Sequence, residues 1–163
     1  MKNNFLIILL ITFGLFSCSQ EDETPLTQLE GTYLGNLLGS DDNPQFVEMT
    51  FQANGELKIE EFRINGKNER CYSSISEGKY SLKGNEFTYT INTFLGLDPA
   101  AFSECFSQSE LMAYLENSGL IQVGSIELKS ENTVFSISYP CYDTFANARV
   151  NLCVGYSDFV LQD

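Results

Sequence analysis

Short segments of alternating apolar and polar residues, separated by turn dipeptides, constrain the fold of this chain more than any other feature. Three sharp turns are marked by Asn54-Gly55, Asn65-Gly66 and Gly84-Asn85. Asn and Gly tolerate the positive φ angles that a two-residue hairpin turn requires. Turn signals that recur every 8 to 12 residues or so favour an all-β sandwich or barrel. The sequence therefore predicts a series of antiparallel hairpins.

The apolar positions between these turns recur with period two, so each strand is expected to have one buried and one solvated face. The predicted inward sets are Val47, Met49 and Phe51; Leu57 and Ile59; Tyr80 and Leu82; Phe87, Tyr89 and Ile91; Phe135, Ile137 and Tyr139; and Val150, Leu152 and Val154. The alternation slips at Glu60-Glu61, where a one-residue β-bulge would restore the register. Later strands are expected at 121–129, 133–139 and 149–162.

The segment between residues 98 and 119 departs from this pattern. Ser107-Gln108-Ser109-Glu110 precedes Leu111, Met112, Tyr114 and Leu115, and Asn117-Ser118-Gly119 follows them. A Ser N-cap, an acidic first turn and a Gly stop predict a short helix over 107–117. Because long excursions between strands are usually functional or disordered, we expect this helix to close one mouth of a barrel, with Leu111, Met112 and Leu115 pointing inward.

Two motifs resemble those of bacterial lipocalin-like lipoproteins. Leu29-Glu30-Gly31-Thr32-Tyr33 is similar to the Gly-x-Trp start of lipocalins, and the run EGKYSLKGNEFT at 77–88 is similar to their middle hairpin. The resemblance implies an all-β, antiparallel lipocalin-like barrel of about eight strands with one short helical excursion, formed by residues 26–163. An immunoglobulin-like sandwich is the alternative architecture.

The N-terminus has the features of an export signal. Lys2 precedes an apolar run over residues 5–16, which is shorter than the roughly 20 residues that a membrane-spanning helix needs. The sequence Leu15-Phe16-Ser17-Cys18 resembles a bacterial lipobox. The resemblance implies that the signal peptide 1–17 is removed and that Cys18 is acylated, which would anchor the protein to a membrane. The alternative is an ordinary free or disulfide-bonded Cys18.

Residues 18–25 are polar and acidic, and they are predicted to form a flexible tether between the lipid and the domain. This acidic run looks like the surface-export signal of lipoproteins in one Gram-negative phylum, although a solvated spacer would have the same composition. We therefore expect a lipid-anchored protein of the outer membrane. Whether it faces the periplasm or the cell surface stays open.

Charge and composition exclude several classes of function. The formal net charge is −13, which disfavours binding to nucleic acid, and the chain has no His. Ser-His-Asp triads, Cys-His dyads and His-containing metal sites are thus excluded. Glu60-Glu61 is interpreted as a bulge with solvated side chains rather than a hydrolytic pair. The oxygen-rich loop at 40–44 is interpreted as a hairpin connection rather than a Ca²⁺ site. We expect no catalytic residues, no metal and no cofactor.

Four cysteines remain if Cys18 is acylated: Cys71, Cys105, Cys141 and Cys153. An even number in an exported chain predicts two disulfides, with three possible connectivities. We favour Cys71–Cys105 and Cys141–Cys153. A four-thiolate zinc site is the alternative, but the sequence has no closely spaced pair of cysteines.

An eight-stranded barrel is just wide enough either to be filled by side chains or to hold one small ligand. The candidate lining residues for such a ligand are Tyr33, Phe51, Phe87, Tyr89, Leu111, Met112, Leu115, Phe135 and Tyr139. Two functions follow. In the first, the protein binds a small apolar molecule at the barrel mouth. In the second, the barrel is filled and its acidic surface serves as an accessory, adhesion or scaffold face within the cell envelope. No protein partner can be identified.

Overall fold

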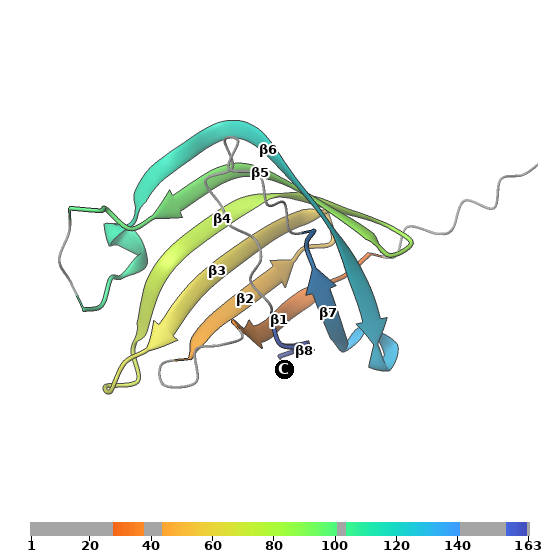
Figure 1. The fold of residues 1–163 in the computed structure, drawn as a ribbon, viewed down its shortest axis with the longest axis horizontal. Helices are drawn as coiled ribbons and strands as arrows, with labels where there is room; N and C mark the ends of the chain where they lie inside the picture. The colour runs from red at the N-terminus through yellow and green to blue at the C-terminus, as the bar shows by residue number, and fades with distance from the viewer. Residues whose placement is uncertain (1–27, 38–43, 101–103, 141–155, 163) are drawn as a thin grey trace, which may run out of the picture.

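Eight antiparallel strands, each paired with its neighbour in chain order, close into a barrel (Figure 1). The computed structural model describes residues 28–37, 44–100, 104–140 and 156–162. The strands are β1 (Gly31–Asn36), β2 (Gln45–Phe51), β3 (Glu56–Ile64), β4 (Arg70–Lys83), β5 (Glu86–Gly96), β6 (Met112–Lys129), β7 (Val134–Ser138) and β8 (Phe159–Leu161). Two short 3₁₀ turns, η1 (Gln108–Glu110) and η2 (Ser130–Asn132), flank β6. Within the described ranges, no helix is long and apolar enough to cross a membrane.

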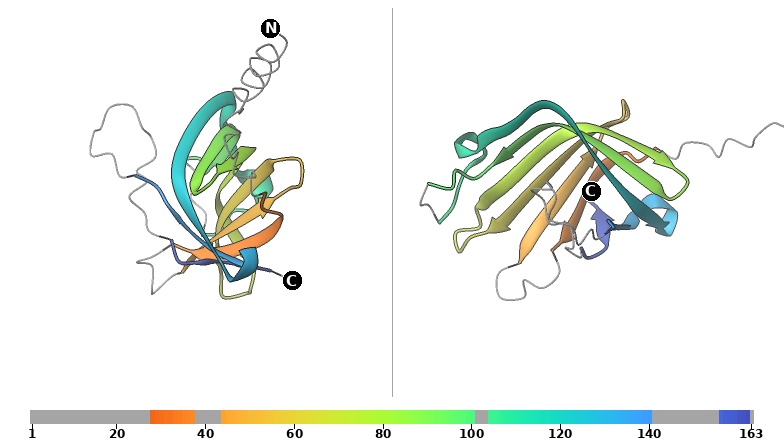
Figure 2. Two further views of the ribbon diagram at one scale, coloured as in Figure 1. Left: turned by 90° about the vertical axis from the view of Figure 1, so that its right-hand side faces the viewer. Right: turned by 45° about the horizontal axis from the view of Figure 1, so that its top comes forward.

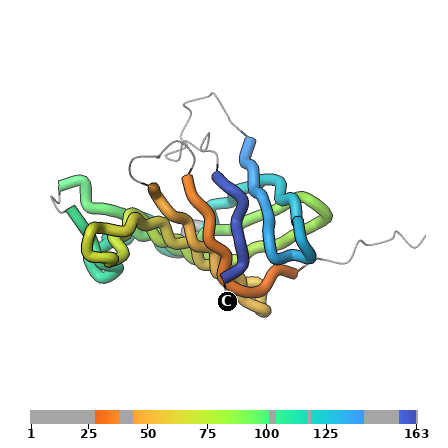
Figure 3. Tube along the Cα trace, turned by 90° about the horizontal axis from the view of Figure 1, so that it is seen from below, coloured from red at the N-terminus to blue at the C-terminus, as the bar shows by residue number. Residues whose placement is uncertain are grey.

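The short strand β8 closes the barrel between the first strand and the seventh. Tyr33 of β1 pairs with Leu161, and Phe135 of β7 pairs with Phe159. Figure 3 shows β8 lying between β1 and β7. The predicted antiparallel barrel of about eight strands is therefore confirmed, and the sandwich alternative is excluded because its two sheets would not close on each other.

The predicted turns lie at hairpin tips. Gly55 and Gly84 have φ angles of 80° and 59°, values that favour glycine. The side chain of Asn65 accepts hydrogen bonds from the backbone N–H groups of Lys67 and Glu69, both at 2.9 Å. A register shift lies at the predicted place, between Glu61 and Phe62 in the pairing of β3 with β4, but the extra residue is Ser73 of β4, and β3 pairs with β2 without a break. The bulge was therefore predicted in the wrong strand, and Phe62 stays on the face opposite to Glu61. Local turn chemistry thus determines where the early strands begin and end.

The sheet formed by β2 to β6 extends beyond the part of the barrel that β7 and β8 close (Figures 1 and 2). Strand β6 pairs with β5 from Met112 to Ser125, but it pairs with β7 only from Ser125 to Lys129. We call the part of the sheet near Gln45, Arg70 and Met112 the extended end. The opposite part, where all eight strands meet, is the packed end.

Aromatic side chains fill the packed end. The ring of Phe135, which is fully buried, lies 5.0 Å from that of Tyr33, 5.8 Å from that of Phe51 and 4.9 Å from that of Phe159, measured between ring centroids. The hydroxyl of Tyr80 donates to the carbonyl of Leu29 at 2.6 Å, which satisfies a buried polar group. Each fully buried aromatic side chain contributes roughly 1.5 to 3 kcal/mol through burial alone.

The predicted helix over 107–117 is wrong. Ser107 and Glu110 do form a capping box, with the Ser107 backbone N–H 2.7 Å from the Glu110 carboxylate. The helical turn nevertheless ends at Leu111, whose φ and ψ are −73° and 142°, and β6 begins at Met112. Isolated short helices are marginal, and here β5 offers backbone partners up to Gly96, which pairs with Met112. Strand pairing therefore overrides the local capping signal.

The last predicted strand, 149–162, is described only in part. Tyr156 forms a single antiparallel bridge with Leu37, and β8 spans three residues. Val150, Leu152 and Val154 lie outside the described residues, as does the loop at 40–43.

Candidate functional site

A polar group of side chains occupies the inner face of the barrel toward the extended end. Val47 of β2 pairs with Glu61 of β3, which pairs in turn with Ser74 of β4. Directly paired residues point to the same side of a sheet, and Val47 belongs to the core. Glu61 and Ser74 therefore face the barrel interior.

Tyr89 extends this polar group. Its hydroxyl donates to the Ser76 hydroxyl at 3.1 Å, and Ser76 lies two residues beyond Ser74 on the same face of β4. The side chain of Ser74 hydrogen-bonds to the Glu61 carboxylate. The bulge adds Ser73, whose hydroxyl donates to the Glu61 carbonyl at 3.1 Å. Backbone and side chain of Glu61 are thus both held by serines of β4.

Burial changes the protonation chemistry of this group. Loss of solvation raises the pKa of the Glu61 carboxyl, and the Ser74 hydrogen bond partly opposes this rise. Burial also raises the pKa of Tyr156 to about 12, and the nearby negative charge of Glu61 adds to the rise. The pKa of Tyr89 is raised to about 12, and that of Tyr139 is raised as well, again mainly by burial. Tyr139 interacts electrostatically with both Tyr156 and Tyr89, and Tyr156 is the phenol that interacts with Glu61.

Glu61 has no cationic partner among the described residues. The ion pairs found there join Lys58 to Glu60, Arg70 to Glu48 and Lys129 to Asp158. No three Cys, Asp or Glu side chains in the described part of the chain are grouped so that they could hold a metal ion.

The prediction of solvated side chains at Glu60-Glu61 is wrong for both residues. Glu61 faces the interior, whereas Glu60 faces the opposite side of β3 and is only 7% exposed. Its carboxylate lies 3.0 Å from the Lys58 ammonium and accepts a 2.5 Å hydrogen bond from Gln108. The segment around η1 therefore covers the outer face of the sheet and does not close a mouth of the barrel.

Apolar side chains remain accessible on the inner face of β5 and β6. The ring of Phe94, which packs against the core, lies 6.3 Å from the ring of Tyr114. Both rings approach the position that a Cβ on Gly96 would take, at 3.4 and 3.1 Å. Leu120 is paired with the inward-facing Ile91, yet it is 43% exposed. The interior at this end is thus polar on one side and apolar on the other.

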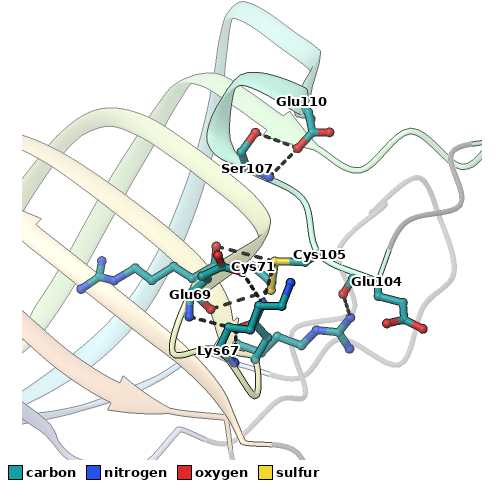
Figure 4. The surroundings of a disulfide bond; sticks show 10 residues. Lys67, Glu69, Cys71, Glu104, Cys105, Ser107 and Glu110 are labelled. Carbon is teal, nitrogen blue, oxygen red and sulfur yellow. Dashed lines mark hydrogen bonds between the residues drawn. A yellow bond between two sulfur atoms is a disulfide. The ribbon is translucent and has the colours of Figure 1, made fainter.

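The tip of the extended end contains a small cavity beside a disulfide. Figure 4 shows the residues around this disulfide. Cys71 of β4 is bonded to Cys105, which confirms the first predicted pairing. The Arg63 guanidinium donates to the Glu104 carbonyl, and the Tyr72 backbone N–H donates to the Phe106 carbonyl at 2.8 Å. The cavity has a volume of about 230 Å³ and is lined by Gln45, Arg63, Cys71, Tyr72, Ser73, Leu97, Glu104, Cys105 and Phe106. The pairing of Cys141 with Cys153 concerns residues outside the described ranges and stays a prediction.

The structure divides the predicted pocket residues into three groups. Tyr33, Phe51, Phe87, Tyr89 and Phe135 belong to the buried core, and the Tyr89 hydroxyl also reaches Ser76. Tyr139 packs against this core and interacts electrostatically with Tyr156. Leu111 follows η1, and Met112 and Leu115 lie on β6; Met112 is 49% exposed, and none of the three is on a helix.

Glu61 is the interior residue that the sequence reasoning missed. Its signal is positional, because Leu57, Ile59 and Glu61 follow each other with period two before the bulge. Comparisons with protein-family models, curated proteins and solved structures found no match. The inner face of the extended end and the N-terminal sequence are therefore the two features that bear on the function of this protein.

Proposed function

We propose that the protein is a non-catalytic, lipid-anchored lipoprotein of the outer membrane that binds a small, largely apolar molecule at the extended end of its barrel. The observation that supports this proposal is the contrast between the two ends. Phe135 and its neighbours fill the packed end. Tyr114 and Leu120 stay 42% and 43% exposed on the inner face of the extended end.

The arrangement suits a ligand that enters only part of the barrel. Ligand sites are mostly apolar and carry a few polar groups that fix orientation. Here Phe94, Tyr114 and Leu120 supply apolar surface, and Glu61 and Ser74 supply the polar groups. The motifs at 29–33 and 77–88, which resemble lipocalin-like lipoproteins, support the same function.

Binding can be tested with two neighbouring residues of β6 that face opposite sides. Leu120 faces inward, whereas Ile121, paired with Thr90, faces outward and is 61% exposed. Leu120→Asp should abolish binding of the neutral fluorescent probe N-phenyl-1-naphthylamine, and Ile121→Asp should leave it unchanged. Circular dichroism would verify that both variants fold. Equal binding by both variants, or no binding by the parent, would contradict the proposal; native mass spectrometry would show whether a ligand co-purifies.

The lipid anchor is tested separately. The sequence Leu15-Phe16-Ser17-Cys18 supports acylation of Cys18. Cys18→Ser should move the protein from the membrane fraction to the soluble fraction because the acyl chains supply the membrane affinity. Unchanged membrane partition after high-salt washing would refute this assignment.

A scaffold or adhesion role is the second candidate, and the outer surface of β6 favours it. Val123 is paired with Thr88 on the outward face and is 48% exposed, close to Ile121. Exposed apolar side chains that lie together can mark contact surfaces. A parent protein that binds no apolar probe, combined with loss of a protein partner in Ile121→Asp, would favour this role over ligand binding.

A further inference from the structure

We propose that the ligand carries a permanently or readily charged amine, and that Glu61 binds this cation on the inner face of the barrel, on the side of Tyr156. This inference rests on the proposed function and specifies the chemical class of the ligand.

The position of Glu61 is unusual for a carboxylate. It follows Leu57 and Ile59 on the inner face of β3, and its paired neighbours are Val47 of the core and Ser74. Moving a carboxylate out of water is costly unless the charge is paired or hydrogen-bonded. A Leu or Ile at this position would continue the apolar face of the strand, so the carboxylate is not needed for packing.

The Glu61 carboxylate can accept further hydrogen bonds in addition to the one from Ser74. An ionised carboxylate can accept about four hydrogen bonds. Ser74 is the hydrogen-bonding side chain found for Glu61, and no described Lys or Arg forms an ion pair with it. Arg63, two residues along the same strand, instead directs its guanidinium to the Glu104 carbonyl beside the disulfide. A ligand cation would supply a charge that no residue in the described part of the chain supplies.

Tyrosine side chains lie near this carboxylate. Tyr156 lies close enough to Glu61 for the two to interact electrostatically, and Tyr139 interacts in the same way with Tyr156 and Tyr89. Aromatic faces attract cations, and quaternary ammonium groups are commonly bound by cages of such rings. The raised pKa values of these phenols keep their rings neutral at physiological pH. A carboxylate together with neutral aromatic rings favours a cation over an anion.

The net charge of the protein and the apolar side chains next to the polar group also favour a ligand that is a cation with an apolar part. A formal net charge of −13 raises the local concentration of cations and lowers that of anions. Next to the polar group, Phe94, Tyr114 and Leu120 offer apolar contact area. The inferred ligand is therefore an amine with an apolar body.

The test compares three probes of similar shape on the purified protein. Benzyltrimethylammonium carries a permanent charge, neopentylbenzene is its neutral carbon analogue, and phenylacetate is an anion. Each is measured by displacement of N-phenyl-1-naphthylamine. We expect benzyltrimethylammonium to bind about tenfold more tightly than neopentylbenzene, and phenylacetate to bind most weakly.

Glu61→Gln is the decisive variant and Glu60→Gln is its matched control. The two positions are adjacent, but Glu60 lies on the outer face and pairs with Lys58. Glu61→Gln should weaken the binding of benzyltrimethylammonium about tenfold and leave that of neopentylbenzene unchanged. Glu60→Gln should alter neither affinity. Equal losses in the two variants would overturn the inference.

A pH series checks the same point without relying on a variant that folds. Among the described residues, Tyr156 is the titratable side chain that interacts with Glu61, and Tyr139 and Tyr89 lie beyond it; their raised pKa values keep all three phenols neutral below pH 9, and the Arg63 guanidinium is directed to the Glu104 carbonyl. Affinity for benzyltrimethylammonium should therefore fall as the pH is lowered through the raised pKa of Glu61, while affinity for neopentylbenzene stays constant.

The outcomes separate the two proposals. If both uncharged probes bind but the cation binds no more tightly than neopentylbenzene, the inference about the amine fails and the proposed function stands. If N-phenyl-1-naphthylamine does not bind to the parent protein at all, both fail. If the affinity for the cation does not depend on pH, Glu61 is not its partner and the inference is overturned.

Discussion

Removing the disulfide at the extended end should measure how strongly one covalent bond stabilises this part of the barrel. The perturbation is the double variant Cys71→Ala/Cys105→Ala. The two cysteines are separated by 34 positions in the sequence, and their bond restricts the unfolded chain. For a closed loop of this length, the chain-entropy relation gives a loss of about 4 kcal/mol in the free energy of unfolding at 25 °C.

Other contacts hold this part of the folded protein in place, so nearly the whole of the calculated loss in the free energy of unfolding should be observed. Cys71 is 3% exposed, and the segment after Cys105 is held by the hydrogen bond from Tyr72 to Phe106 and by that from Gln108 to Glu60. These contacts can keep the segment in place when the bond is absent. The native state should therefore change little, and the unfolded state should gain entropy.

The assay is urea unfolding followed by far-UV circular dichroism, together with tyrosine fluorescence, since the chain has no Trp. Each single variant should lose as much stability as the double variant, because either substitution removes the same bond. The slope of the free energy against urea should rise, since an unfolded chain without the cross-link exposes more surface. A loss below about 1 kcal/mol would refute the reasoning from loop length.

Three further predictions concern packing and charge. Phe135→Ala should cost about 3 to 5 kcal/mol in urea unfolding, because the fully buried ring contacts three other aromatic rings of the packed end; a cost below about 1 kcal/mol would mean that this end is not packed as described. Gly78→Ala should lower the free energy of unfolding by about 3 kcal/mol, because a Cβ would lie 1.9 Å from the Thr90 carbonyl oxygen. Gly66→Ala is the control: no atom lies within 4 Å of the position its Cβ would take, so the urea midpoint should change little. Glu61→Gln should have a higher free energy of unfolding than the parent protein at a pH above the raised pKa of Glu61. This difference should shrink as the pH falls through that pKa, because the parent protein then loses the charge on Glu61. A difference that does not depend on pH would contradict a carboxylate removed from water.

Local sequence determined the early hairpins of this protein. Asn-Gly and Gly-Asn dipeptides favour tight turns whatever lies elsewhere in the chain, so the tips at 54–55, 65–66 and 84–85 were predictable. Period-two alternation likewise identified the core residues of β2 and β5, whereas the slip at Glu60-Glu61 indicated the place of a register shift but not that its extra residue lies in β4. Each of these signals acts over a few residues, and the sequence displays them directly.

Only the tertiary structure decided the segment from Ser107 to Met112. Its capping signal is genuine, but a few residues of helix cannot compete with strand pairing to β5, and the sequence does not show that β5 lies alongside. The roles of Glu60 and Glu61 were decided in the same way. Their chemistry is identical, yet Gln108, far along the chain, covers one carboxylate, while Tyr156 lies near the other inside the barrel. Burial of a charge depends on which distant segments approach it, and that is fixed only when the barrel closes.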